Sequence, residues 1–179
     1  MKKLSLLILL CMASVLCAEK VNLVQNGDFS KGKLHWQLHR CFLVGKTIEF
    51  SNKQPDYIQL SQKLAMALPA DRAFRLEADL EVSDPYDVIA NEKGWVSQLK
   101  LACFNANKKW IHEKGRIGAA TNIKPCTGIK TFVFTGKIPP ETAFAEVIIN
   151  SRFPLKVTVH EIRLFMEMTP EEKSNFKVQ

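Results

Sequence analysis

The segment from Phe74 to Val82 (FRLEADLEV) alternates strictly between apolar and polar residues. In an extended chain, the apolar residues from Phe74 to Val82 share one side, and the charged residues between them share the other. A helix would scatter the same residues around its circumference. The segment therefore predicts an antiparallel strand with one buried face and one solvated face.

Shorter alternations of the same kind recur along the chain. They occupy Tyr57 to Leu64, Val96 to Phe104, Thr131 to Thr135, Ala143 to Asn150 and Val157 to Phe165. Clusters of Asn, Asp, Ser and Pro separate these runs, and such clusters are typical of turns. We predict an all-β fold, an antiparallel β-sandwich over residues 19–168, followed by a polar tail over 169–179 that begins like a capped helix.

The last predicted strand contains a change of parity. Its apolar residues stand at 157 and 159 and then at 162 and 164. A strand that keeps one face buried can change parity only by inserting an extra residue. The sequence therefore predicts a β-bulge at His160-Glu161.

Residues 1–18 have the order of a secretory signal peptide. A positive start at Lys2-Lys3 precedes a short apolar stretch, and the small residues Cys17 and Ala18 precede Glu19. We expect cleavage after Ala18 and a secreted protein, extracellular or periplasmic. Lipid attachment at Cys17 is the alternative, although Leu16 is larger than the residue that usually precedes a lipidated cysteine. No other run is long and apolar enough for stable membrane insertion.

Charge and cysteine content exclude several classes. Loss of Lys2 and Lys3 lowers the net charge from +7 to +5, and the remaining basic residues are interleaved with acids. We therefore expect no nucleic acid partner, and acidic polymers fit the charge better. Cys41, Cys103 and Cys126 allow at most one internal disulfide and have no zinc-site spacing.

The segment from Val21 to Trp36 (VNLVQNGDFSKGKLHW) combines a short apolar run with tight turns. Asn26-Gly27-Asp28 is a strong turn sequence, and Gly32 permits a second bend. Phe29 then returns an apolar group to the core. Trp36 is more simply a core residue than a sugar platform, because small β folds usually bury their tryptophans.

This segment resembles the opening of carbohydrate-binding modules of the family 4 and family 9 type. The resemblance rests on N-L-V-x-N-G-D-F-S-x-G-x-x-x-W from Asn22 to Trp36. It continues at Leu60-Ser61-Gln62, at Phe74 to Glu81, and in the closing pair of strands. The resemblance implies a jelly roll with a galactose-binding-like fold and a glycan ligand.

The resemblance also implies a calcium ion between the first loop and the last strand. The usual donors are an acidic residue directly after the N-G-x-F turn and an acidic pair in the closing strand. This chain has Ser30 in the first place and His160-Glu161 in the second. A hydroxyl and an imidazole are poor ligands for calcium, so Asp28, Ser30 and Glu161 are weak candidates. We expect no cofactor and no tightly bound metal.

A sugar site needs an aromatic face for stacking and polar groups for the hydroxyls. The aromatic candidates are Trp95, Trp110, Tyr57 and Tyr86. Either indole could instead point inward if the hairpin turn centres on Ala106-Asn107. The polar candidates are Arg75, Asp79, Gln98 and Lys100, which we expect to form one polar surface on neighbouring strands. The alternative is that these charged rows are simply the solvated side of a sheet.

Three functions fit these observations. The leading one is a secreted, non-catalytic carbohydrate-binding protein whose partner is a polysaccharide or oligosaccharide. The second is an extracellular or envelope β-sandwich that binds a protein partner. A glycan-active hydrolase or lyase is the third, although the chain has neither a nucleophile-elbow motif nor a His-Glu metal motif.

Overall fold

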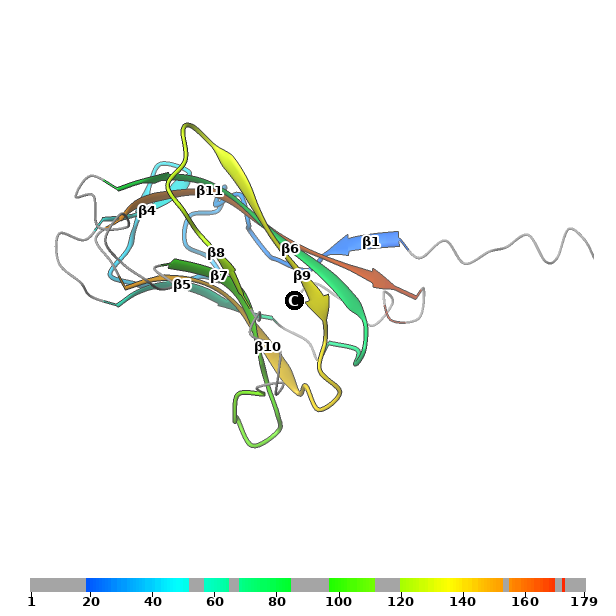
Figure 1. Cartoon of the computed structure of the whole chain (residues 1–179). Coiled ribbons are helices and arrows are strands. Elements are labelled where there is room, and N and C mark those ends of the chain that lie inside the picture. The colour runs from blue at the N-terminus through cyan, green and yellow to red at the C-terminus, as the bar shows by residue number, and fades with distance from the viewer. Residues whose placement is uncertain are drawn as a thin grey trace, which may run out of the picture.

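A computed structural model describes residues 19–51, 57–64, 68–84, 97–111, 120–152, 155–169 and residue 172. Its strands form two antiparallel sheets that pack face to face (Figure 1). The predicted signal peptide and all of the tail except residues 169 and 172 lie outside the described ranges. Within those ranges, no helix is long and apolar enough to cross a membrane.

In the described part of the chain, sheet A has six strands. Five of them follow the order β3-β4-β11-β6-β9, and β1 pairs with the remaining length of β11. Their bounds are β1 (Glu19–Asn22), β3 (Phe42–Val44), β4 (Thr47–Ser51), β6 (Ala73–Ser83), β9 (Lys130–Lys137) and β11 (Lys156–Met168).

Over the same described ranges, sheet B has five strands in the order β2-β5-β10-β7-β8. Their bounds are β2 (Gln37–His39), β5 (Ile58–Lys63), β7 (Ser97–Phe104), β8 (Ala120–Asn122) and β10 (Phe144–Ser151). Both layers bend in the same direction, so that the outer face of sheet B lies on the inner side of the bend (Figure 1). The predicted all-β antiparallel sandwich is confirmed.

The long predicted strands are all present, with ends that differ by a few residues. In β6 the alternation has the predicted result, because Phe74, Leu76, Ala78, Leu80 and Val82 are buried and belong to the core between the sheets. Burial of such side chains is the main favourable term in folding a sandwich.

The predicted bulge in the last strand is also confirmed. The register of β11 against β6 shifts between Val159 and Glu161, so that His160 is the inserted residue. Val159 and Ile162 are both buried, although they differ in parity along the strand. The bulge thus allows one strand to contribute to the core along its whole length.

The first loop fastens both sheets together. Toward sheet A, the Asn22 side-chain oxygen accepts hydrogen bonds from the Val24 amide (3.1 Å) and the Leu164 amide (3.0 Å). Toward sheet B, Gln62 makes two hydrogen bonds with the backbone of Gln25, to its amide (2.8 Å) and its carbonyl (2.7 Å). The loop therefore receives one polar anchor from each layer.

Asn26 and Trp36 organise the turn itself. Asn26 has a positive φ of 51°, and its side-chain amide donates to the Gly32 carbonyl (2.8 Å). The Trp36 indole donates to the Asn26 carbonyl (2.9 Å) and is only 6% exposed. Its ring lies 5.4 Å from that of Phe29 between centroids. The prediction that Phe29 and Trp36 are core residues is confirmed.

The start of the tail has the capping interactions that its sequence suggests. The Glu172 carboxylate accepts from the Thr169 amide (2.7 Å), and the Thr169 hydroxyl accepts from the Glu172 amide (3.2 Å). These reciprocal bonds form a capping box. The Thr169 amide is also the main cause that lowers the pKa of the Glu172 carboxyl.

Candidate functional site

The polar candidates lie on opposite sides of the sandwich. Arg75 and Asp79 stand on β6 and point outward from sheet A, whereas Gln98 and Lys100 stand on β7 and point outward from sheet B. The expectation that they share one surface is wrong. The reason is topological, since β6 pairs with β11 and β9, while β7 pairs with β10 and β8. β6 and β7 follow one another along the described chain but belong to different layers.

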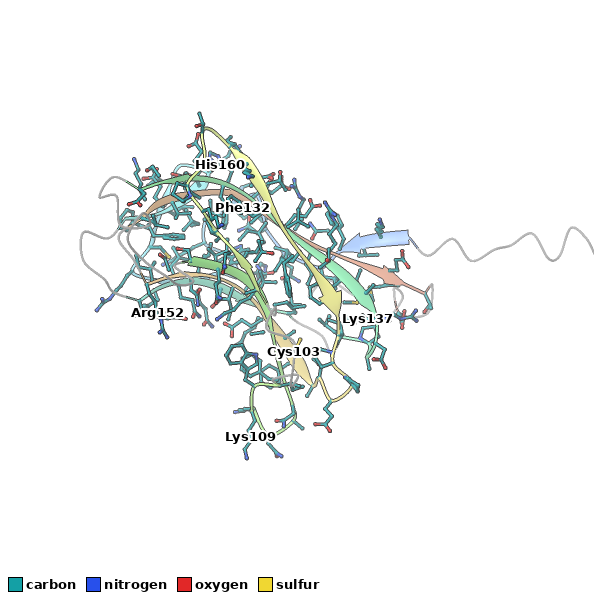
Figure 2. All side chains as sticks on the ribbon, in the orientation of Figure 1. Cys103, Lys109, Phe132, Lys137, Arg152 and His160 are labelled. Atoms are coloured by element: carbon teal, nitrogen blue, oxygen red, sulfur yellow. The ribbon has the colours of Figure 1, made fainter. Side chains whose placement is uncertain are left out.

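Two aromatic candidates cannot be placed. Trp95 and Tyr86 lie outside the described residues. The remaining candidates lie on the outer faces of the two sheets. In Figure 2 the label His160 lies on the upper layer, sheet A, and the label Arg152 lies on the lower layer, sheet B.

The outer face of sheet A carries a closed charge cluster centred on Arg163. Its guanidinium lies 2.9 Å from Asp79, 2.7 Å from Glu161 and 3.3 Å from Glu77. Asp79 also accepts a hydrogen bond from the Thr131 hydroxyl (2.6 Å). A ligand hydroxyl would therefore have to compete with these partners for Asp79.

Arg75, the other candidate on this face, also has an acidic partner. Its guanidinium pairs with Glu77. Arg75 also lines a shallow hollow of about 150 Å³ with Lys20, Phe74 and Glu167, beside the pairing of β1 with β11. None of the large apolar side chains that are exposed in the described part of the chain lines this hollow.

The outer face of sheet B carries a row of three aromatic rings. Phe104 pairs with Phe144 in the β7–β10 register and with Trp110 across an isolated bridge. The Phe104 and Phe144 rings stack at 4.9 Å between centroids with 7° between their planes. Trp110 is 41% exposed. The inward alternative for Trp110 is therefore wrong, because the turn places Trp110 opposite Phe104 rather than opposite Cys103.

Short buried side chains form the middle of this face. Ile148 of β10 lies between Lys100 of β7 and Ser61 of β5, and Ala102 is the next outward residue of β7 after Lys100. Ile148, Ser61 and Ala102 are all less than a tenth exposed. Longer polar side chains flank them on the same strands, among them Gln59, Gln98, Lys100 and Glu146. Such a surface offers donors and acceptors on either side of an apolar centre.

A second aromatic position lies at the opposite end of the face from Trp110. Tyr57 is 36% exposed and hydrogen-bonds Gln59. The Arg152 guanidinium lies 5.9 Å from the centroid of the Tyr57 ring, and His39 lies 6.3 Å from it between centroids. Figure 2 shows Arg152 extending outward from the lower layer.

Lys100 joins the polar and aromatic parts of the face. Its ammonium nitrogen lies 5.2 Å from the centroid of the Trp110 ring, a cation–π geometry. Burial lowers the pKa of Lys100, the positive charge of Arg152 lowers it further, and Glu146 acts in the opposite direction. The positive charge of the Lys100 ammonium is thus only partly balanced by negative charge around it.

Several residues of this face were not predicted as site residues. They are Phe104, Phe144, Gln59, Ile148 and Arg152. The parity of Phe104 and Phe144 carried a signal, because each alternates with buried neighbours and so must point outward. Arg152 follows the end of β10, where sequence alternation gives no information.

The calcium candidates do not form a ligand set. The Asp28 carboxylate accepts from the Ser30 amide (3.2 Å) and hydroxyl (2.9 Å), and these bonds lower the pKa of Asp28. Glu161 is paired with Arg163 in the charge cluster of sheet A. Among the described residues, no group of three or more His, Cys, Asp or Glu side chains could hold a metal ion. Weak or absent calcium binding at this corner stays a prediction.

Comparison with known proteins gives matches at the level of structure. The sequence matches no family model, and no curated protein is significantly similar to it. A xylan-binding CBM22 domain of Paenibacillus barcinonensis Xyn10C has a TM-score of 0.58 and 8% identity over 86% of this chain and 99% of its own. A CBM4 structure has a TM-score of 0.50 and 12% identity over 86% of this chain and 90% of its own.

This chain has the fold of carbohydrate-binding modules. The enzymatically active domain of bacteriophage CBA120 tailspike protein 4 also contains a similar unit, with a TM-score of 0.59 and 13% identity over 82% of this chain. The chain spans 21% of that tailspike domain. The carbohydrate-binding modules, in contrast, match over nearly their whole length.

Proposed function

We propose that this protein binds a polysaccharide or oligosaccharide, without catalysis, on the outer face of sheet B. The observation that carries the proposal is the exposed Trp110 ring next to a face of polar side chains on the inner side of the bend (Figure 1). An aromatic ring can stack on the apolar side of a sugar, and the flanking amides and charges can bind its hydroxyls. The similar CBM22 domain is described as xylan-binding, which makes xylan a natural first probe.

Affinity electrophoresis in gels containing soluble polysaccharides tests the proposal directly. We expect retardation by at least one polymer, and Trp110→Ala should abolish it while leaving the circular dichroism spectrum unchanged. Phe42→Ala is the matched control, because Phe42 is an exposed aromatic residue (55%) on β3, in the other sheet. Equal retardation of the wild type and Trp110→Ala would contradict a glycan site at Trp110 on this face.

We also propose that binding takes place outside the cell, because residues 1–18 have the features of a signal peptide. Mass spectrometry of the exported protein should show a chain that begins at Glu19. A chain that keeps Met1, or that carries lipid on Cys17, would contradict simple secretion.

A protein partner is the second candidate function, and one surface favours it. Leu34, Phe42, Leu43 and Val44 are all exposed, and β3 is an edge strand of sheet A. Exposed apolar edge strands are prone to pair with other chains. Retention by none of the polysaccharides, in the wild type and in both variants, would favour this second function.

A further inference from the structure

Lys100 is a half-buried cation on the proposed binding face. It lies on β7 directly opposite Ile148 of β10 and Ala120 of β8. Within the described ranges, no carboxylate forms an ion pair with its ammonium group, and Glu146 affects it only by longer-range attraction. This differs from the outer face of sheet A, where Arg163 pairs with three carboxylates.

The surroundings of Lys100 favour the arrival of an anion. The side chain is half-buried, and Arg152 acts on it as a like charge on the same face. Partial burial weakens the hydration of the ammonium, and a neighbouring cation raises its energy further. An anionic group placed beside Lys100 would offset both effects, and a bond between charged groups is stronger than one to a neutral hydroxyl.

Trp110 fixes where that anion would lie. The indole ring holds the Lys100 ammonium 5.2 Å from its centroid, so the stacking surface and the cation adjoin one another. A sugar stacked on the exposed part of the indole would bring the substituents of that sugar, or of the next one, to Lys100. Gln98 on the same strand and face could then bind the remaining hydroxyls.

We propose that the glycan bound by this face is acidic and that Lys100 pairs with its carboxylate or sulfate group. This inference rests on the proposed function, since it concerns the ligand of the same site. The positive net charge of the chain agrees with it but does not locate it. Lys100 is the residue that discriminates acidic from neutral glycans.

Matched polymers separate this inference from glycan binding in general. The probes are uronic-acid polysaccharides with their carboxyl-reduced forms, and sulfated polysaccharides with their desulfated forms. We expect the protein to bind the acidic member of one pair at least tenfold more tightly than the neutral member. The affinity for the acidic member should fall as the salt concentration rises from about 50 to 300 mM, because salt screens charge pairs. The two series distinguish a carboxylate from a sulfate.

Charge variants assign the preference to Lys100. Lys100→Gln should reduce the acidic-over-neutral ratio about tenfold, and Lys100→Arg should retain most of it. Lys137→Gln is the control, because Lys137 is exposed on β9 of the opposite sheet. A wild-type ratio in Lys100→Gln would overturn the role of Lys100.

The remaining outcomes are also decisive. Equal binding of acidic and neutral members would overturn the acidic-ligand inference and leave glycan binding intact. Retention of none of the polymers, acidic or neutral, would overturn the proposed function and the inference with it.

Discussion

At the scale of single residues, the first loop depends on one close backbone approach. Gly27 accepts a hydrogen bond from the Ile162 amide (2.9 Å), and a Cβ atom added at Gly27 would lie 2.0 Å from the Ile162 carbonyl oxygen. We predict that Gly27→Ala lowers the free energy of unfolding by roughly 2–4 kcal/mol, since neither backbone can yield without breaking the contact. Chemical denaturation of the purified protein measures this change.

Gly45→Ala is the comparison, because Gly45 has a positive φ of 61° but no atom within 4 Å of an added Cβ. It should cost only about 1 kcal/mol, the usual penalty for a left-handed alanine. Equal costs for the two variants would show that the contact between Gly27 and Ile162 does not hold the loop.

At the scale of the elements, sequence alternation predicted the long strands because each has one face in the core. The bulge at His160 was predicted for the same reason. The apolar residues before and after it can share the buried face of the strand only if one extra residue is inserted between them. The short strands β2, β3, β4 and β8 were not predicted, since three to five residues give too little alternation to recognise. The placement of Asp79 apart from Lys100 was missed because parity does not say which sheet a strand joins.

The link between the first loop and sheet B gives a prediction at this scale. Gln62→Leu should lower the free energy of unfolding by about 2–3 kcal/mol, because the amide and carbonyl of Gln25 would both lose their partner away from full solvent. Thermal unfolding followed by circular dichroism measures the change. Gln59→Leu on the outer face of the same strand should have a much smaller effect, and similar losses for both would argue against the anchor.

At the scale of the whole molecule, the sandwich keeps its two outer faces separate. One face holds the charge cluster of Arg163, where every named carboxylate has a partner, and the other holds Trp110 and Lys100. The core between them consists of apolar side chains from both sheets. We therefore expect changes on one face to affect the stability of the molecule without altering what the other face binds.

Arg163→Met tests this separation. It leaves Glu77, Asp79 and Glu161 close together without their shared cation, so the free energy of unfolding should fall by roughly 1–3 kcal/mol. Glycan retention, measured well below the unfolding temperature, should remain at the wild-type level. Lys100→Gln should give the reverse pattern, with weaker retention and nearly unchanged stability. If Arg163→Met weakened retention as much as Lys100→Gln does, the two faces would be coupled through the core, and the binding surface could not be assigned to sheet B alone.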